Sequence, residues 1–373
     1  MRILVVHLDD KINLCPPALN VIENLLDQGH KVYCVGYSIT EIKEEILHNK
    51  NFKYYDIGEY ISPNNKLKKY LIRFNSRVKI RKFIKENINK FDLVWTTSEI
   101  TVREIGPILL QAKKHIMQLM ELAEYVPQFG GYKFLKFNIQ KYAENATKVV
   151  VPEINRAYII KAWWGLKKMP IVLPNKPYST EISHVSQQAK KAVEKVKNEK
   201  RKIILYQGGF TADRKFDNFI KAVDSMGEGY CLYLMGKDNQ YRQSICDKYP
   251  NVKYLGYLMP PEHLLIAQYA QVGILTYVPV KDGFHSVLNA LYCAPNKTYE
   301  YAYCKLPMVG TNVPGLKEIF DKYKVGACIK EDNVEGVINA IKYVEQNHSL
   351  MEKNCIKYFD SVNLKEIVKD IIS

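Results

Sequence analysis

The stretch Ala294–Val309 reads APNKTYEYAYCKLPMV and combines a helix start with the beginning of a strand. Pro295 and Asn296 favour the first positions of a helix, so a helix is expected to begin near Lys297. Backbone N–H groups at such a start attract an anion, and the Lys297 ammonium adds a full positive charge. Glu300 follows one turn later on the same side, where its carboxylate can accept two hydroxyl hydrogen bonds from a ribose. The alternative is a surface helix start with a capping pair.

A second segment with phosphate-binding character lies upstream of this helix. An apolar strand-like run, Leu205–Gln207, ends in Gly208 and Gly209, and glycines allow a backbone to approach a ligand closely. Arg214 and Lys215 then offer a planar fork and a point charge for a pyrophosphate. Taken alone, this pattern fits an ordinary loop equally well. Beside the segment around Lys297, it favours a nucleotide diphosphate site.

Short apolar runs separated by helical stretches extend through both halves of the chain. This alternation is typical of doubly wound parallel sheets, and a Pro-rich connector at residues 172–177 separates two such patterns. The runs that we interpret as strands are residues 3–6, 31–35, 92–95, 148–151, 203–206, 232–235, 252–255, 272–275 and 307–310. The sequence therefore predicts an α/β protein with domains at residues 1–177 and 178–355. A last helix, at about residues 356–373, can pack back on the first domain.

The segment from Pro295 to Val309 resembles the donor-site signature of retaining GT-B glycosyltransferases, especially glycosyltransferase family 4 and its relatives in bacterial surface-polysaccharide synthesis. Lys305 stands where the family usually has a glycine. The resemblance implies two Rossmann-like domains that face a central cleft, with a nucleoside diphosphate sugar as donor and a carbohydrate or lipid-linked hydroxyl as acceptor. It also implies that Glu300 binds the ribose, and that Arg214 and Lys215 neutralise the leaving diphosphate together with Lys297.

Other donor contacts are expected where further predicted strands end. Lys237 and Tyr257 follow two of these strands, in loops that the family uses for its nucleobase pocket. The remaining donor-side candidates are Asn289, Asn296 and Thr298. Many family members place a second glutamate eight residues before the ribose glutamate, and this chain has Tyr292 there. The identity of the sugar therefore does not follow from the resemblance.

The acceptor side is less clearly marked in the sequence. Cys15 and Pro16 lie in the loop after the first strand, where GT-B enzymes usually admit the acceptor. Glu121 falls roughly where relatives carry a polar residue near the reacting carbon, and Glu124 follows it. Other polar groups that could face the cleft are His7, Asp9, Asp10 and His115. For each of these side chains, an ordinary surface or core role is the alternative.

The formal net charge of +15 is concentrated in Lys66–Lys90, where ten Lys and Arg residues stand against Glu86 alone. Apolar residues recur through this run at roughly helical spacing, which indicates a basic amphipathic helix or two short ones. It can be a solvated face or a surface for anionic lipid headgroups. No nucleic-acid motif accompanies it, so nucleic acid is not expected as a partner.

No apolar stretch is long enough for a membrane span, and the first residues lack a signal-peptide cleavage site. The eight cysteines show no metal-binding spacing, and no Asp-x-Asp pair ends a strand. We therefore expect a cytoplasmic protein, either free or peripheral on the inner membrane face, that needs neither a metal nor a cofactor apart from its donor. The rival interpretations are a sugar-nucleotide epimerase of the same fold and a non-catalytic GT-B subunit that binds carbohydrate or a partner.

Overall fold

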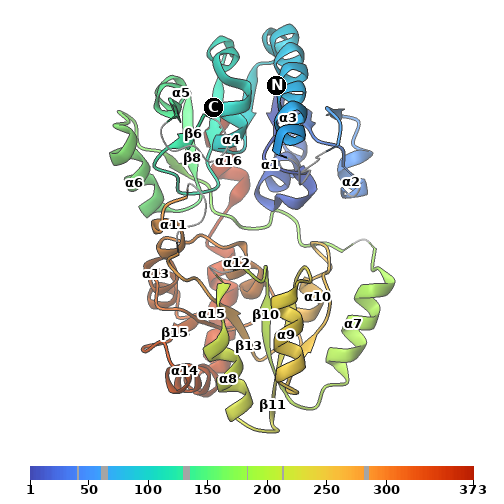
Figure 1. Cartoon of the computed structure of the whole chain (residues 1–373), viewed down its shortest axis with the longest axis vertical. Helices are drawn as coiled ribbons and strands as arrows, with labels where there is room; N and C mark the ends of the chain where they lie inside the picture. The colour runs from blue at the N-terminus through green and yellow to red at the C-terminus, as the bar shows by residue number, and fades with distance from the viewer. Residues whose placement is uncertain (40–41, 60–65, 129–134, 183, 212–213, 281–284) are drawn as a thin grey trace. The chain divides into compact units, whose positions relative to one another are not determined.

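The computed structural model describes residues 1–373 except 40–41, 60–65, 129–134, 183, 212–213 and 281–284. It divides the chain into two compact units (Figure 1). The first unit comprises Met1–Ser179, residues 283–286 and Asn363–Ser373. The second unit comprises Thr180–Asp282 and Val287–Val362. Each unit is built around one parallel sheet, as the sequence predicted.

The sheet of the first unit has seven strands in the order β3-β2-β1-β4-β5-β8-β9, all parallel. Its strands are β1 (Arg2–Val6), β2 (Lys31–Gly36), β3 (Phe52–Asp56), β4 (Leu93–Thr96), β5 (His115–Gln118), β8 (Lys148–Val151) and β9 (Ile171–Val172). The central strands are apolar on both faces because helices cover the sheet on both sides. The four predicted strands are confirmed. The sequence analysis missed β3, β5 and β9, which are polar or very short.

Helices and one small hairpin complete the first unit. The helices are α1 (Pro16–Asp27), α2 (Glu44–Leu47), α3 (Lys66–Asn87), α4 (Glu99–Ile105), α5 (Ile139–Asn145), α6 (Ile154–Trp164) and α16 (Leu364–Ile372). The hairpin pairs β6 (Val126–Pro127) with β7 (Lys136–Phe137). Local side chains fix where several helices begin. The Ser98 hydroxyl, for example, accepts a hydrogen bond from the backbone N–H of Thr101 and so caps α4.

The sheet of the second unit has six parallel strands in the order β12-β11-β10-β13-β14-β15. Its strands are β10 (Lys202–Gln207), β11 (Tyr230–Met235), β12 (Val252–Tyr254), β13 (Val272–Leu275), β14 (Met308–Gly310) and β15 (Gly326–Cys328). All five strands predicted for this half are confirmed, and only β15 was missed. The helices are α7 (Gln187–Lys197), α8 (Asp217–Ser225), α9 (Gln240–Lys248), α10 (Leu264–Ala267), α11 (Leu288–Leu291), α12 (Asn296–Tyr303), α13 (Pro314–Tyr323), α14 (Val334–Gln346) and α15 (His348–Asp360).

Successive residues of β10 show how this second sheet is filled on both faces. Ile203 and Leu205 belong to the apolar cluster that includes α12 and α15. Ile204 and Tyr206 belong to the cluster on the opposite face, with α8 and α14. Because side chains alternate along a strand, one strand supplies both layers of the core.

The strand order reverses beside the first strand of each sheet. In the first unit β1 lies between β2 and β4, and in the second unit β10 lies between β11 and β13. At such a switch point the connections leave in opposite directions, which opens a crevice beyond the carboxyl ends of the two central strands. The loops after β1 and β4, and those after β10 and β13, are therefore the positions at which each unit can bind a ligand.

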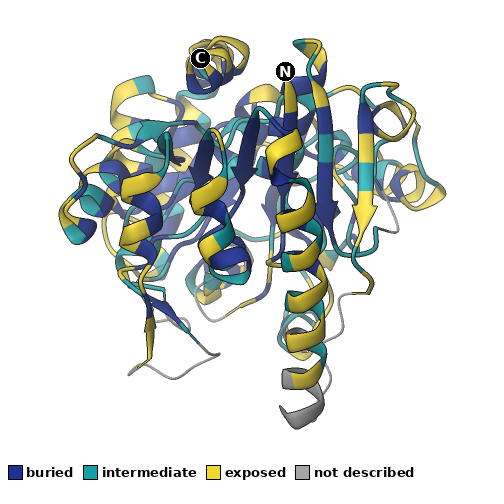
Figure 2. Ribbon diagram, turned by 90° about the horizontal axis from the view of Figure 1, so that it is seen from above, coloured by how far each residue is buried: buried dark blue, intermediate teal, exposed yellow. Residues whose placement is uncertain are grey.

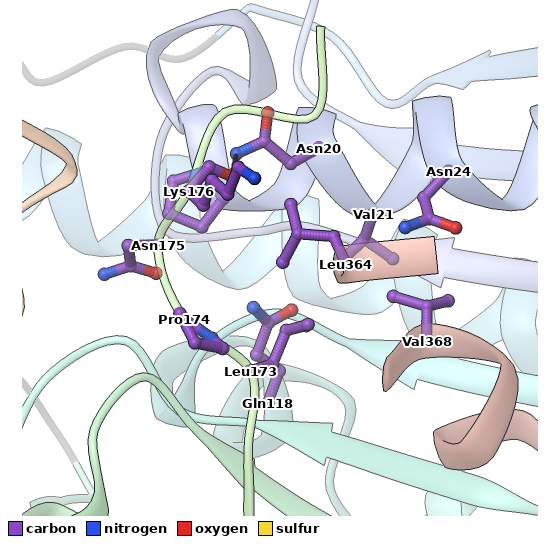
Figure 3. A pocket seen from close by; sticks show the side chains of 11 residues that line it. Asn20, Val21, Asn24, Gln118, Leu173, Pro174, Asn175, Lys176, Leu364 and Val368 are labelled. Atoms are coloured by element: carbon purple, nitrogen blue, oxygen red, sulfur yellow. Dashed lines mark hydrogen bonds between the residues drawn. The ribbon is translucent and has the colours of Figure 1, made fainter. Parts of the chain in front are cut away.

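The C-terminal part of the chain is shared between the two units. Helix α15 contributes Cys355 and Tyr358 to a core cluster of the second unit, so the segment that joins the first unit is residues 363–373 rather than the predicted 356–373. Helix α16 packs on α1, and Lys365 forms an ion pair with Asp27 at 2.7 Å. Figure 3 shows a small pocket lined by Val21 and Asn24 of α1 and by Leu364 and Val368 of α16.

Helix α3 confirms that the basic run is helical, but its apolar side chains do not form one buried stripe. Ile80 and Ile84 are buried, whereas Leu71, Phe74 and Val78 are at least half exposed. Figure 2 shows exposed residues along this long helix. Among the described residues, no helix is long and apolar enough to cross a membrane.

Candidate functional site

Helix α12 begins one residue before the predicted position. Pro295 is its N-cap residue, with an extended backbone and no side-chain cap, and Asn296 and Lys297 are the first helical residues. Their backbone N–H groups precede the first intrahelical bonds and can donate to an anion. Asn296 and Lys297 are both half-buried. The start of α12 therefore has the geometry expected of a phosphate-binding helix end.

Glu300 is buried in the second turn of α12, with 8% of its surface exposed. Its Oε2 atom lies 3.3 Å from Nε2 of His263, which immediately precedes α10. Burial acts to raise the pKa of Glu300, but the charge and hydrogen bond of His263 and the charge of Lys297 outweigh burial and lower that pKa. The carboxylate is thus held ionised, in the form that accepts hydrogen bonds from hydroxyl groups.

A second cation lies next to Lys297. Burial, followed by the charge of Arg214, lowers the pKa of Lys297, while Glu300 opposes this shift. The guanidinium carbon of Arg214 lies 3.9 Å from the ring centre of Tyr277, a cation–π contact that fixes the direction of the side chain. The structure therefore brings Arg214, Lys297 and Glu300 together. Lys215 is exposed instead and is not among the charges that shift the pKa of Lys297.

Gly208 gives the Lys297 side chain its space. A Cβ atom at Gly208 would lie 3.3 Å from Cε of Lys297 and 3.1 Å from the Tyr206 hydroxyl. The backbone is also crowded on its other side, because a Cβ at Gly236 would lie 1.9 Å from the Gly208 carbonyl oxygen. Gly209 has ordinary contacts only. Of the two predicted glycines, Gly208 is the one that the packing requires.

The remaining donor-side candidates fall into different surroundings. Lys237 lies after β11 with its Nζ atom 5.6 Å from the ring centre of Tyr257, so these two residues are neighbours. The Thr298 hydroxyl is buried and donates to the Pro295 carbonyl, which gives Thr298 a structural role. Asn289 is half-buried in the short helix α11.

Three buried polar atoms near this switch point have no hydrogen-bond partner among the described residues. They are Oε1 of Gln207, Nδ1 of His263 and Oγ1 of Thr276. Gln207 ends β10 and Thr276 follows β13, so both stand at the carboxyl edge of the sheet. Buried polar atoms are almost always paired, and these three are therefore candidates to contact a bound ligand. The sequence analysis missed all three, although the positions of Gln207 and Thr276 at strand ends were a usable signal.

In the first unit, the acceptor-side candidates gather around the start of α1. Cys15 is its N-cap residue and Pro16 its first helical residue. Burial raises the pKa of the Cys15 thiol to about 12, and the charges of nearby Asp9, Asp10 and Glu121 act in the same direction. Cys15 is therefore a protonated thiol and not a nucleophile.

Two other acceptor-side predictions have different outcomes. Glu124 is exposed, and its backbone carbonyl accepts a hydrogen bond from the indole of Trp164. His115 is wrong as a cleft residue, because it is buried inside β5 with Nε2 3.0 Å from Oγ1 of Thr96. Burial lowers the pKa of His115 to about 4, which keeps the ring neutral within the core.

The two doubly wound parallel sheets give the chain the GT-B fold. Solved structures with this fold include sucrose-phosphate synthase from Thermosynechococcus elongatus (TM-score 0.71, 16% identity, 100% of this chain and 97% of that chain covered). Anabaena HepE in complex with UDP and glucose aligns with a TM-score of 0.67 at 12% identity, over 100% of this chain and 98% of that chain. WaaG, a glycosyltransferase involved in lipopolysaccharide biosynthesis, aligns at 0.64 and 13%, with the same coverage.

Residues 187–360 match the family described as glycosyl transferases group 1. This match spans most of the second unit, including α12 and the strands β10 and β13. The chain therefore has the GT-B fold, and its residues 187–360 are similar to the group 1 glycosyl transferases. No curated protein matches the chain by sequence.

Proposed function

We propose that this protein transfers a sugar from a nucleoside diphosphate sugar to a hydroxyl acceptor with retention of configuration. The observation that carries this proposal is the grouping of Glu300, Lys297 and Arg214 at the start of α12. A carboxylate beside two cations and a helix N-terminus matches a ribose linked to a diphosphate. Structures with this fold include HepE in complexes with UDP and with UDP-glucose, which supports a nucleotide-sugar donor.

The catalytic contribution of these side chains is electrostatic. When the bond between the sugar and the diphosphate breaks, negative charge grows on the leaving phosphate. Lys297, Arg214 and the N–H groups of α12 are placed to stabilise that charge, which is the role a divalent ion has in other sites. We therefore propose a metal-independent reaction.

For the acceptor, we propose a lipid-linked or other carbohydrate in bacterial surface-polysaccharide or glycolipid synthesis, reached from the cytoplasmic side of the membrane. The support is helix α3, where Leu71, Phe74 and Val78 are exposed on a strongly basic helix. Such a face can insert apolar side chains between headgroups while lysines contact anionic lipids. Arg77 does not belong to this surface, because its guanidinium donates two hydrogen bonds to Glu104 at 2.6 and 2.9 Å.

A panel of nucleoside diphosphates and nucleotide sugars, read by thermal shift, tests the donor proposal. A ligand that binds only the folded protein raises the melting temperature as its concentration rises. We expect one nucleotide series to stabilise the protein and its Lys297→Ala variant to lose most of that shift. Lys195→Ala, an exposed lysine on α7, is the matched control. Equal shifts in the native protein and both variants would contradict a diphosphate site at α12.

Turnover assays distinguish transfer from the two rival functions. Tyr292, which replaces the second glutamate of many relatives, is the feature that favours a non-catalytic subunit. Such a subunit would bind the nucleotide sugar without releasing nucleoside diphosphate, with or without acceptor sugars. An epimerase would convert the sugar without any acceptor. Release of nucleoside diphosphate that rises with added acceptor sugar, and a glycoside product, would support transfer.

A further inference from the structure

An acidic group of side chains lies at the switch point of the first unit, outside the donor-side group described above. Asp9 and Asp10 follow β1, and Glu99 opens α4 directly after β4. The edges of β1 and β4 are adjacent because these two strands pair with each other. Glu99 is the charged neighbour with the largest effect on the pKa of Asp9. The three carboxylates therefore stand at the position where a doubly wound sheet binds ligands.

Two histidines pair with some of these carboxylate oxygens, but not with all of them. Nε2 of His7 lies 2.6 Å from Oδ1 of Asp10, while Nδ1 of the same ring lies 2.7 Å from Oγ1 of Thr97. His285 lies farther from Glu99, with Nε2 3.6 Å from Oε1. Asp10 is thus paired directly, and Asp9 and Glu99 supply the remaining acceptor oxygens.

Glu99 carries the observation that points to a ligand. Its side chain is 2% exposed, yet Oε2 has no hydrogen-bond partner among the described residues. An unpaired carboxylate oxygen in a buried position is destabilising unless a bound group donates a hydrogen bond to it. A fold that keeps a glutamate here, rather than a glutamine or an apolar residue, is consistent with a ligand that donates hydrogen bonds.

The charge of the site selects the chemistry of that ligand. Carboxylates only accept hydrogen bonds, and hydroxyl groups of a sugar donate them in pairs at short spacing. A phosphate or carboxylate on the ligand would be repelled by Asp9 and Glu99, whereas the cationic group around Lys297 in the second unit attracts one. The site therefore fits a ligand with hydroxyl groups and no negative charge, unlike the donor diphosphate.

We propose that Asp9 and Glu99 form a hydroxyl-recognition site for the reacting end of the acceptor, which is an uncharged sugar at that end. This inference rests on the proposed function in treating the bound sugar as an acceptor. Any phosphate on the acceptor, including one that links it to a lipid, must then lie away from this site. Asp9 and Glu99 bind the acceptor and are specificity-determining residues.

The site also implies a direction of pH dependence. Desolvation by the surrounding protein, followed by the charge of Glu99, raises the pKa of Asp9 to about 6; Asp10 acts in the same direction, and His7 and His285 oppose it. An ionised carboxylate accepts hydrogen bonds from hydroxyl groups better than the neutral acid does. Sugar binding should therefore strengthen as the pH rises from about 5 to about 7, while Asp9 loses its proton.

Saturation-transfer NMR with simple probes tests the proposal. The probes are the methyl α-glycosides of glucose, galactose and mannose, together with glucose 6-phosphate and glucosamine, and UDP reports separately on the second unit. We expect at least one neutral glycoside to give a signal, and glucose 6-phosphate to give at least ~10-fold less. Asp9→Asn changes an exposed side chain and Glu99→Gln a buried one, and each should weaken glycoside binding at least ~10-fold. Both should leave the UDP signal unchanged.

Glu144→Gln is the control, because it removes the same charge from an exposed position on α5. The inference is overturned if no neutral glycoside binds the native protein, if glucose 6-phosphate or glucosamine alone binds, or if Asp9→Asn binds glycosides as the native protein does. Its failure is distinguishable from that of the proposed function. If UDP binds and the glycosides do not, only the proposal of a hydroxyl-recognition site is wrong. If the native protein does not bind UDP, the result counts against the donor site.

Discussion

The first unit places Asp9, Asp10 and Glu99 beyond β1 and β4, whereas the second unit places Arg214 and Lys297 near the ends of β10 and β13. Both sheets are parallel and doubly wound, and both reverse their strand order beside their first strand. The backbone therefore offers the same kind of crevice twice, and the side chains give the two crevices opposite charge. The cations of the second unit favour a diphosphate, and the carboxylates of the first unit favour hydroxyl groups. The fold determines where a ligand can bind, and the residues at the strand ends determine its chemistry.

The largest expected effect comes from removing charge in the second unit. Glu300→Ala and Lys297→Ala should each lower transfer by at least ~100-fold, because a charge-assisted contact is worth about 3 kcal/mol. Steady-state rates with saturating acceptor, and circular dichroism to confirm folding, provide the measurement. Lys215→Ala should have a smaller effect, since Lys215 is exposed. If both α12 variants turned over normally, the charge difference between the units would have no bearing on catalysis.

The membrane proposal predicts a difference between basic helices of the two units. Replacing Lys79, Lys82 and Lys85 of α3 with glutamine should weaken binding to phosphatidylglycerol vesicles by up to ~100-fold, at about 1 kcal/mol per lysine. These three side chains are exposed. Sedimentation at low and moderate salt measures the binding, which salt should weaken.

The control replaces three exposed lysines of α7 in the second unit, Lys191, Lys195 and Lys197. It changes the net charge by the same amount and should leave sedimentation unchanged. If both triple variants lost binding equally, net charge rather than α3 would explain it. A native protein that stays in the supernatant at both salt concentrations would rule out the membrane role of α3.

A smaller effect is expected from His263, which we assign as a positioning residue for Glu300. His263→Phe should raise the KM for the nucleotide sugar by ~10-fold, since one hydrogen bond to a charged group is worth about 1.5 kcal/mol. His263→Gln keeps a donor near the carboxylate and should recover most of this loss. Kinetics of both variants at several donor concentrations make the comparison. An equal loss in the two variants would indicate a packing role for the imidazole ring instead.

The smallest expected effect is that of a chelator. If Arg214 and Lys297 perform the charge stabilisation, excess EDTA should leave the transfer rate unchanged within error. The assay is run with and without added magnesium or manganese. Loss of activity that either metal restores would show that a cation shares the work of the second unit, and the acidic first unit would then be the first place to search for it.

Local patterns in the sequence were sufficient for most of the fold. Apolar runs such as Ile203–Tyr206 identified the central strands, because strands buried on both faces contain few polar residues. β3 and β9 lack such an apolar run and were therefore not predicted. β3 is mainly exposed, and β9 consists of two half-buried residues. The start of α12 was predicted within one residue because Pro295 and Asn296 specify it locally.

The tertiary structure decided which side chains meet. The sequence by itself indicated Lys297, Glu300 and Arg214, but the contact between His263 and Glu300 joins residues far apart in the chain. Burial of Glu99 and its unpaired oxygen were equally invisible in the sequence, where Glu99 is an ordinary residue of a helix start. Helix and strand starts depend on neighbouring residues, whereas burial and pairing depend on what the rest of the chain packs beside a residue. For that reason the sequence defined the two sheets, and only the folded chain revealed the opposite charge at their edges.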